Sequence, residues 1–185
     1  PTRRGDAGTR SLNFALQAAL NPPKPGKQER RFGELVFREG DRVMQTRNNY
    51  DVVWQKEDGT AGTGIFNGDV GKIAKIDPSG ELLEIVFDDR TATYTSDMLA
   101  ELDMAYAMTV HKAQRSEYRG VVFVGAPCAP SLMVRGVLYT AITRARELLV
   151  IVGDDSAVNK MAENDRRSLR YSGLKWRLRK GGEEK

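Results

Sequence analysis

Residues Leu138–Val152 read LYTAITRARELLVIV, and this stretch decides the fold class of the C-terminal half of the chain. It ends in a near-continuous apolar run, Leu148–Gly153, and a similar run, Gly120–Gly125 (GVVFVG), precedes it. Between the two runs, Ser131–Arg146 has the pattern of a largely helical segment. Apolar runs that alternate with helices are typical of a parallel sheet covered on both faces. The sequence therefore predicts an α/β fold here, with a helix also expected after Met108–Val110.

A different pattern lies upstream of these runs. Val70–Ile76 is strand-like, with apolar positions separated by outward lysines, and Leu82–Phe87 and Thr91–Tyr94 supply two more strands. Short strands separated by turns over about 35 residues predict a small barrel or meander. Such a unit is too small for a free-standing domain, so we interpret residues 67–104 as an insertion.

The N-terminal third combines one helix with polar connections. Ser11–Leu20 predicts a helix with Ser11 as its N-cap, and Asn21-Pro22-Pro23 ends it. An apolar stripe on this helix consists of Leu12, Ala15, Leu16 and Ala19. Residues 46–64 are polar and contain glycine, which predicts a loop.

Composition excludes several classes of protein. The 185 residues are 40% hydrophobic and 29% charged, as in ordinary globular domains. No stretch approaches the roughly 18 apolar residues of a membrane span, so we expect no membrane association and a cytoplasmic location. The lone cysteine, Cys128, excludes an internal disulfide and any multi-cysteine metal site. The only histidine, His111, lies in a separate motif, so Cys128 is expected to be structural.

The basic charge is concentrated at the C-terminus. Lys160–Lys185 contains nine Lys or Arg against four Asp or Glu, whereas the rest of the chain sums to −1. Tyr171 and Trp176 are interleaved with these charges, a pattern that suits phosphate contacts and base stacking. The alternative is a solvated terminal helix or a frayed end.

Two segments carry the candidate chemistry: Ala107–Tyr118 (AMTVHKAQRSEY) and the quoted Leu138–Val152. Their order, with a buried strand between them, resembles motifs V and VI of superfamily 1 helicases, and the RecD-like branch in particular. In that branch the motifs read T-[VI]-H-K-[SA]-Q-G-S-E-[FY] and Y-T-[AG]-[IL]-T-R-A. Upstream, the likeness continues through Gly40–Met44, Asn48–Tyr50 and Gly64–Gly71, and Pro1–Asn21 is similar to the segment around motif IV.

The resemblance implies a fold and a domain order. The expected fold class is α/β, a C-terminal RecA-like domain of the P-loop NTPase type with a parallel sheet. It implies that residues 1–66 and 105–160 form this second RecA-like motor domain. Residues 67–104 would then be an inserted SH3-like β-barrel, and residues 161–185 a basic C-terminal tail.

The same resemblance implies a nucleotide site. A motor needs a positive charge that reaches the γ-phosphate when two domains close, and arginine supplies a permanent, bidentate donor. By resemblance Arg144 is the catalytic arginine finger, and Glu117 and Gln114 also belong to the ATP-binding set. Without the resemblance Arg144 and Arg146 are solvated charges on a helix, and Arg146 keeps that interpretation.

A track for nucleic acid is expected along the first motif. Thr109, His111 and Lys112 carry donors suited to phosphates or bases. The resemblance adds Asn13 and Arg4 to these DNA-binding candidates. A structural role is the alternative for His111.

One position departs from the RecD-like pattern. Arg115 stands where that branch has glycine between Gln and Ser, a residue that permits tight backbone positions. Arginine there would crowd the site, lower turnover or add a phosphate contact.

The resemblance implies an ATP-dependent 5′→3′ DNA helicase acting in DNA repair or recombination. The chain begins at Pro1 and contains no G-x-x-x-x-G-K-[ST] sequence. We therefore expect it to be cut from a longer protein, whose N-terminal RecA-like domain binds ATP and Mg²⁺, and to be inactive alone, with no metal ligands. Expected partners are single-stranded DNA, that domain, and other repair or nuclease subunits. The alternatives are an RNA track, and a non-catalytic nucleic-acid or protein binding module built on the barrel.

Overall fold

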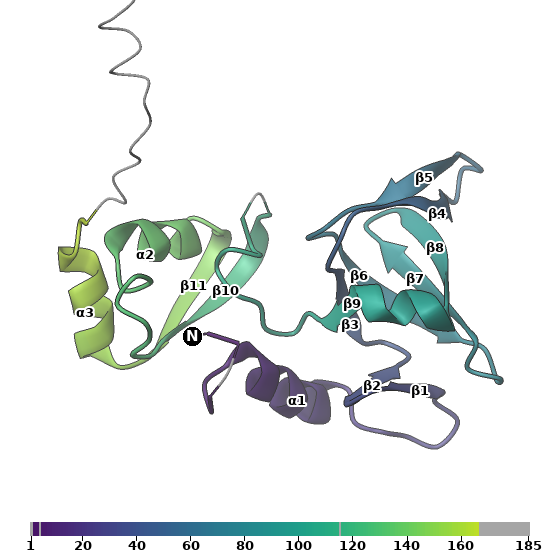
Figure 1. Cartoon of the computed structure of the whole chain (residues 1–185), viewed down its shortest axis with the longest axis horizontal. Helices are drawn as coiled ribbons and strands as arrows, with labels where there is room; N and C mark the ends of the chain where they lie inside the picture. Colours follow the sequence, from purple (N-terminus) through teal and green to yellow (C-terminus); the bar gives the residue numbers. More distant parts are fainter. Residues whose placement is uncertain (1, 4, 115, 167–185) are drawn as a thin grey trace, which may run out of the picture.

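The computed structural model describes residues 2–3, 5–114 and 116–166 (Figure 1). The helices of these residues are α1 (Thr9–Leu20), α2 (Arg135–Ile142), α3 (Asp155–Glu163) and the 3₁₀ helix η1 (Ser96–Glu101). The first strands are β1 (Glu29–Phe32), β2 (Leu35–Arg38), β3 (Arg42–Gln45), β4 (Asn49–Gln55), β5 (Ala61–Ile65) and β6 (Val70–Ile76). The remaining strands are β7 (Leu82–Phe87), β8 (Arg90–Thr95), β9 (Leu102–Met104), β10 (Tyr118–Gly125) and β11 (Ala145–Gly153).

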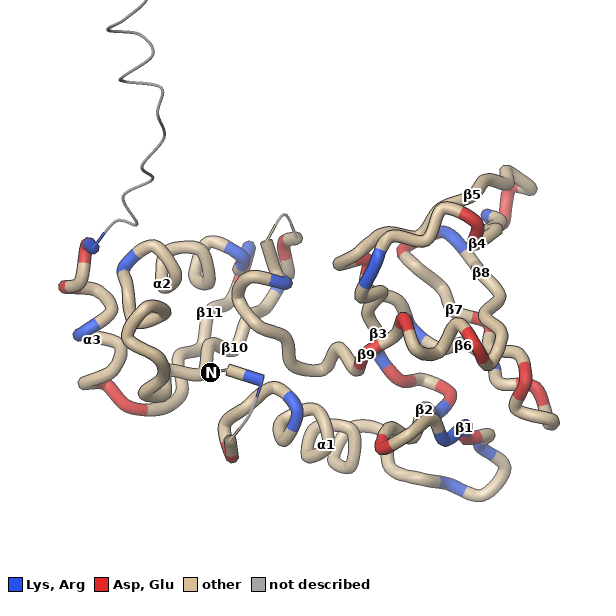
Figure 2. Tube along the Cα trace, in the orientation of Figure 1, with Lys and Arg blue, Asp and Glu red and all other residues tan. Residues whose placement is uncertain are grey.

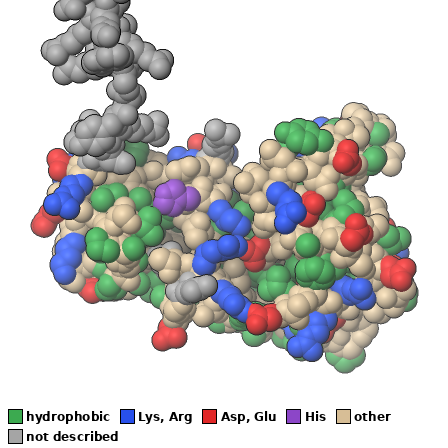
Figure 3. All heavy atoms as spheres, viewed as in Figure 1, with side chains coloured by type: hydrophobic (Ala, Val, Ile, Leu, Met, Phe, Trp, Pro, Cys, Tyr) green, Lys and Arg blue, Asp and Glu red, His purple; other side chains and the backbone are tan. Residues whose placement is uncertain are grey.

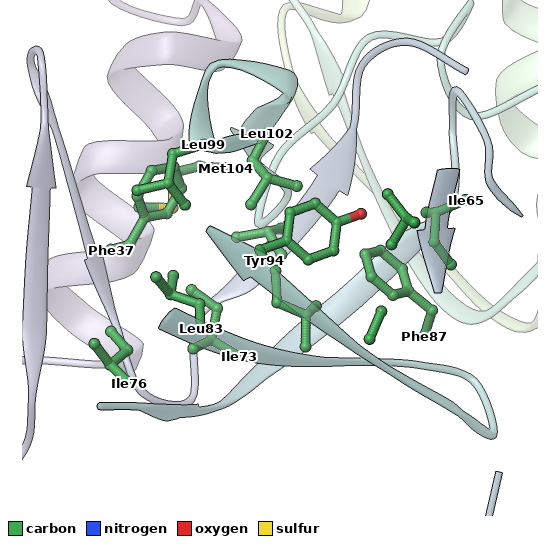
Figure 4. Packing of buried hydrophobic residues seen from close by; sticks show 14 residues of the cluster. Phe37, Ile65, Ile73, Ile76, Leu83, Phe87, Tyr94, Leu99, Leu102 and Met104 are labelled. Atoms are coloured by element: carbon green, nitrogen blue, oxygen red, sulfur yellow. The ribbon is translucent and has the colours of Figure 1, made fainter. Parts of the chain in front are cut away.

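Seven of these strands form one antiparallel sheet, in the order β5-β4-β8-β7-β6-β3-β9. The sheet bends around a core that contains Phe37, Phe87 and Tyr94, all fully buried (Figure 4). The strand predicted over Val70–Ile76 is confirmed, and its Ile73 and Ile76 both lie in this core because the register shifts between Ile73 and Lys75. Of the four other strands, β1 and β2 form a small hairpin beside the sheet.

The predicted loop over residues 46–64 was wrong, since most of this segment forms β4 and β5. The misleading signal was glycine. Gly62 lies against the ring of Trp54, where an added Cβ would sit only 2.4 Å from a ring carbon. Glycine is thus needed in β5 to make room for the indole of the neighbouring strand, rather than to make a turn.

The C-terminal half is α/β, with β10 and β11 paired in parallel as predicted. Helices α2 and α3 pack against this pair around Phe123, Ala141 and Met161. Two predictions were wrong here. Residues 110–114 form hydrogen-bonded turns instead of a helix, and helix in 131–146 is confined to α2. The helix is shorter than predicted because the chain has already entered β11 at Ala145.

Strand β11 is rich in apolar residues, but no described part of the chain buries them. Its apolar residues from Leu148 to Val152 are 37–60% exposed, and Val122 on β10 is 65% exposed. The expectation of a sheet covered on both faces is therefore not met within the described residues. Exposed apolar area of this kind marks a surface that binds another structural element.

Helix α1 was predicted, but it is buried through its polar face. Thr9, Asn13 and Gln17, each four residues apart, are 5–8% exposed, and this spacing places them on one side of the helix. Of the predicted apolar stripe, Leu12 and Leu16 are only partly buried, and Ala15 and Ala19 are exposed. The apolar stripe thus does not form the most buried contact of this helix.

A buried carboxylate explains why the polar face is inside. Asp41 is fully buried and accepts hydrogen bonds from Gln17 Nε2 (2.6 Å), Asn21 Nδ2 (2.6 Å) and the hydroxyl of Tyr106 (2.8 Å). The main-chain N–H of Arg38 donates to it as well, at 2.7 Å. A buried carboxylate with this many donors is well satisfied, and it ties α1 to the seven-stranded sheet.

Ser11 was wrongly predicted as the N-cap of α1. The helix begins at Thr9, and the Ser11 hydroxyl donates to the carbonyl of Gly5 at 3.0 Å. This hydrogen bond holds the preceding turn against the first turn of the helix.

Candidate functional site

The segment between β9 and β10 carries most of the predicted site residues. It folds as turns, in which the N–H groups of Lys112 and Ala113 donate to the carbonyl of Thr109 at 3.0 and 3.1 Å. Ala113 is buried, and it anchors the turns, whereas His111 and Gln114 are exposed. Figure 3 shows the single histidine of the chain at the surface, with basic side chains nearby.

Lys112 and Arg3 share one acidic partner. Asp103 of β9 lies 3.1 Å from Nη2 of Arg3 and 3.8 Å from Nζ of Lys112. Burial lowers the pKa of Lys112 and Arg3 lowers it further, while Asp103 opposes both effects. Figure 2 shows basic positions both at the start of α1 and in the segment connecting β9 to β10. Two cations beside one carboxylate leave positive charge at this surface, which suits a phosphate.

Arg144 lies where α2 gives way to β11, and its side chain is directed at the first motif. Nη1 donates to the carbonyl of Ser116 at 3.1 Å, Nε to the carbonyl of Thr140 at 3.1 Å, and Nη2 to the hydroxyl of Thr143 at 3.2 Å. A guanidinium has five N–H donors, so two remain for another acceptor. The two sequence motifs are therefore joined through this one partly buried side chain.

Arg146 was predicted as a solvated charge on a helix, but it lies in β11 and, although exposed, pairs with Glu117. Nε of Arg146 lies 2.7 Å from Oε2 of Glu117, and the hydrogen bond and charge of Arg146 lower the pKa of Glu117. A signal for this pair was present in the sequence. The two residues stand at the starts of two strands that were predicted to be parallel, and such ends lie at the same edge of a sheet.

The other predicted site residues fall into two groups. Asn13 is brought close to the first motif from α1, but its side chain is occupied: Nδ2 donates to the carbonyls of Met104 and Ala107, and Oδ1 accepts from the N–H of Ala107. Its contact with DNA stays a prediction. Arg4, Arg115 and the aromatic residues of the basic tail lie outside the described residues.

A cavity of about 230 Å³ lies beside Thr109 and His111. Its wall is apolar, with Phe123 from β10, Val137 from α2 and Met161 from α3. Cys128 also lines it. The first motif thus lines this cavity of the α/β half and also reaches the protein surface.

The part of the chain that the structure describes contains no cluster of three or more His, Cys, Asp or Glu side chains arranged to hold a metal ion. No helix in that part combines the length and the hydropathy that crossing a bilayer requires. The two remaining N–H donors of Arg144 suit an anionic group such as a phosphate.

Two family models match the chain in succession. Residues 12–87 match the model described as the ATP-dependent RecD-like DNA helicase SH3 domain. Residues 104–152 match the UvrD-like helicase C-terminal domain, which includes both motifs described above. The first match begins inside α1, in agreement with the attachment of that helix to the seven-stranded sheet.

Curated relatives align with almost the whole chain. The ATP-dependent RecD2 DNA helicase of Deinococcus radiodurans is 35% identical over 97% of the chain, and the RecBCD enzyme subunit RecD of Mycolicibacterium smegmatis is 29% identical over 97%. The chain spans 23% and 28% of the lengths of these two relatives.

A solved structure shares the fold. The crystal structure of Bacteroides Pif1 bound to ssDNA aligns with 94% of the chain and 44% of that chain, at a TM-score of 0.53 and 15% identity. At this identity the similarity supports the arrangement of the elements and carries no residue-level comparison.

Proposed function

This chain belongs to the RecD-like DNA helicases, and from that premise we propose that it is the C-terminal motor half of an ATP-dependent DNA helicase. The observation that carries the proposal is the position of Arg144. Its guanidinium joins the second motif to Ser116 of the first and keeps two N–H donors for another acceptor. In the proposal, this one side chain responds to both nucleotide and nucleic acid.

In this proposal ATP binds between this chain and an N-terminal RecA-like domain elsewhere in the parent protein. Arg144 acts as the arginine finger, and Glu117 and Gln114 hold the sugar side of the nucleotide. Bound ATP and Mg²⁺ supply the phosphoanhydride and the charge neutralisation that phosphoryl transfer requires. Arg146 fixes Glu117 in place through their 2.7 Å pair.

Single-stranded DNA is the proposed substrate, with movement in the 5′→3′ direction. Thr109, His111 and Lys112 provide the contacts, since His111 is exposed and Lys112 lies in a surface with excess positive charge. Asn13 supports them by fixing Ala107 at the start of the segment. Arg4 is proposed as a further phosphate contact.

The predicted order, an SH3-like barrel inserted in a second RecA-like motor domain and followed by a basic tail, is retained as part of the proposal. The proposed barrel is extended from residues 67–104 to the whole seven-stranded sheet, which begins at Arg42. The exposed apolar residues of β11 and β10 support a motor domain whose sheet is covered by other parts of the same protein. We further propose a cytoplasmic enzyme of repair or recombination, alone or with nuclease subunits.

The test is ATP hydrolysis by the full-length parent with and without single-stranded DNA, together with unwinding of duplexes that carry a 5′ or a 3′ tail. The proposal expects hydrolysis stimulated by DNA and unwinding from the 5′ tail. A parent that does not hydrolyse ATP contradicts the motor, and unwinding from the 3′ tail alone contradicts the polarity.

A binding module is the second candidate, because the seven-stranded sheet has an extensive core of its own. It predicts that nucleic acid or a protein partner binds without ATP and that Arg144 is dispensable. The same hydrolysis measurement separates the two candidates.

A further inference from the structure

Two large aromatic side chains stand exposed at one corner of the seven-stranded sheet. Tyr50 at the start of β4 is 65% exposed, and Phe66 just after β5 is 40% exposed. Their ring centroids are 5.6 Å apart, and the ring planes meet at 72°. Rings of this size normally contribute to a core, so an exposed pair in mutual contact indicates a binding surface.

The pair is held outward by a network of hydrogen bonds in the neighbouring backbone. Asn49 donates to Glu101 at 2.9 Å, and the N–H of Asn67 donates to Oδ1 of Asn48 at 3.0 Å. The ring of Phe66 also lies against Gly64, where an added Cβ would come within 2.9 Å of it. The two rings are therefore preorganised, which reduces the entropy lost when a ligand binds.

The surroundings of this corner are polar and carry both charges: Asp51 is exposed next to Tyr50, and the N–H of Phe66 donates to Asp69 at 3.1 Å. Arg47 and Asn48 are exposed immediately before Tyr50. Arg47 has no ion pair with any residue that the structure describes. A cation and an amide beside exposed rings can bind a phosphate and the edge of a base at the same time.

The corner lies on the side of the sheet that faces the candidate site. In Figure 1 the start of β4 and the end of β5 are turned towards β10 and β11, and the β4–β5 hairpin extends to the opposite side. We take a strand bound at Thr109–Gln114 to continue towards this end of the sheet.

We propose that Tyr50 and Phe66 form a stacking platform for one unpaired nucleobase of the strand that contacts Thr109–Gln114. The proposal rests on the proposed function and extends it by naming a second contact point on the sheet. The occupant is a base because the exposed groups are π faces with an unpaired guanidinium and an amide beside them. An apolar protein partner would leave Arg47 desolvated and unpaired.

The test is photocrosslinking of the full-length parent to single-stranded oligonucleotides that carry 5-iododeoxyuridine at successive positions. We expect a crosslink in the peptide that contains Tyr50 or Phe66, formed from one position of the oligonucleotide. Tyr50→Leu should weaken binding by about fivefold to a hundredfold, the range for one base–aromatic stack. Tyr50→Phe keeps the ring and should retain most of the affinity.

Val53→Ala is the matched control, because Val53 lies on the same strand and is 63% exposed without an aromatic ring. It should bind DNA as the wild type does. DNA binding that persists without a crosslink at this corner, and with Tyr50→Leu unimpaired, overturns the platform but leaves the motor intact. A parent that does not bind single-stranded DNA overturns both.

Discussion

Nη1 of Arg144 donates a hydrogen bond to the main-chain carbonyl of Ser116 at 3.1 Å. Twenty-eight positions separate the two residues in sequence, and each belongs to a different motif of the candidate site. The N–H of Tyr118 also donates to the carbonyl of Arg144, at 2.8 Å, so the segments are fastened at two points. A displacement of the first motif must therefore be transmitted to the guanidinium.

Replacing Arg144 tests that relationship in the full-length parent. Arg144→Ala should lower the turnover of DNA-stimulated ATP hydrolysis by about 10³ or more, the usual effect of losing an arginine finger. Arg144→Lys should remain well below the wild type, because lysine keeps the charge but not the planar fork of donors. Steady-state kinetics will measure both changes.

Arg119→Ala is the matched control for that experiment. Arg119 forms a bidentate pair with Glu147 on the exposed side of the same two strands, and its side chain is 85% exposed. Its loss should leave turnover near that of the wild type. An equal fall in both variants would show that Arg144 acts only on the stability of β10 and β11.

The pair of Arg146 and Glu117 makes a prediction about pH. Arg146 lowers the pKa of Glu117, so Arg146→Ala should raise that pKa towards the ordinary value of a glutamate. Because the folded-state pKa is depressed, the stabilisation from this pair is complete above the ordinary pKa and is lost as the pH falls through the lowered one. An NMR titration of the Glu117 carboxyl carbon will measure the shift. An unchanged pKa would contradict the pairing.

Asp41→Asn should destabilise the chain strongly. The carboxylate accepts four hydrogen bonds, and an amide would turn an N–H₂ group towards two of those donors. We expect a loss of about 2–4 kcal/mol in the free energy of unfolding, measured by chemical denaturation. The exposed Asp51→Asn, on the same sheet, should change it by less than about 0.5 kcal/mol.

Two glycines should respond to alanine in opposite directions. Gly153 has φ of 131°, and an added Cβ would lie 2.2 Å from the carbonyl oxygen of Gly125, so Gly153→Ala should cost about 1–3 kcal/mol or more. Gly136 in α2 has no atom within 4 Å of that position, so Gly136→Ala should stabilise by up to about 1 kcal/mol. Thermal unfolding of both variants will give the sign of each effect.

The parts of the fold that the sequence predicted are those with a regular local pattern. Strand β6 was found with its observed limits because its apolar residues are separated by exposed lysines and turn residues stand on both sides of it. Strand β5 was missed because its Gly62 makes room for the indole of Trp54, a partner on another strand. The same reason hid the burial of α1, since Gln17 meets Asp41 only after the chain has turned back.

The candidate site divides in a similar way. Arg144 was identified through a motif, but its acceptor is the main-chain carbonyl of Ser116, and every residue has such a group. No pattern of side chains can indicate which carbonyl is used. The pairing of Arg146 with Glu117, in contrast, could have been predicted from the sequence. Once two parallel strands are predicted, their first residues are expected at the same edge of the sheet.

The buried polar face of α1 determines which segment of this chain can be transplanted. An engineer who grafts only the seven-stranded sheet onto another protein would remove Gln17 and Asn21, and would leave Asp41 in the interior without two of its donors. The buried carboxylate, with two donors missing, would lower the stability of the grafted sheet. The portable unit therefore starts at Thr9, ahead of the first strand, and gene fusions that respect this boundary should retain a stable sheet.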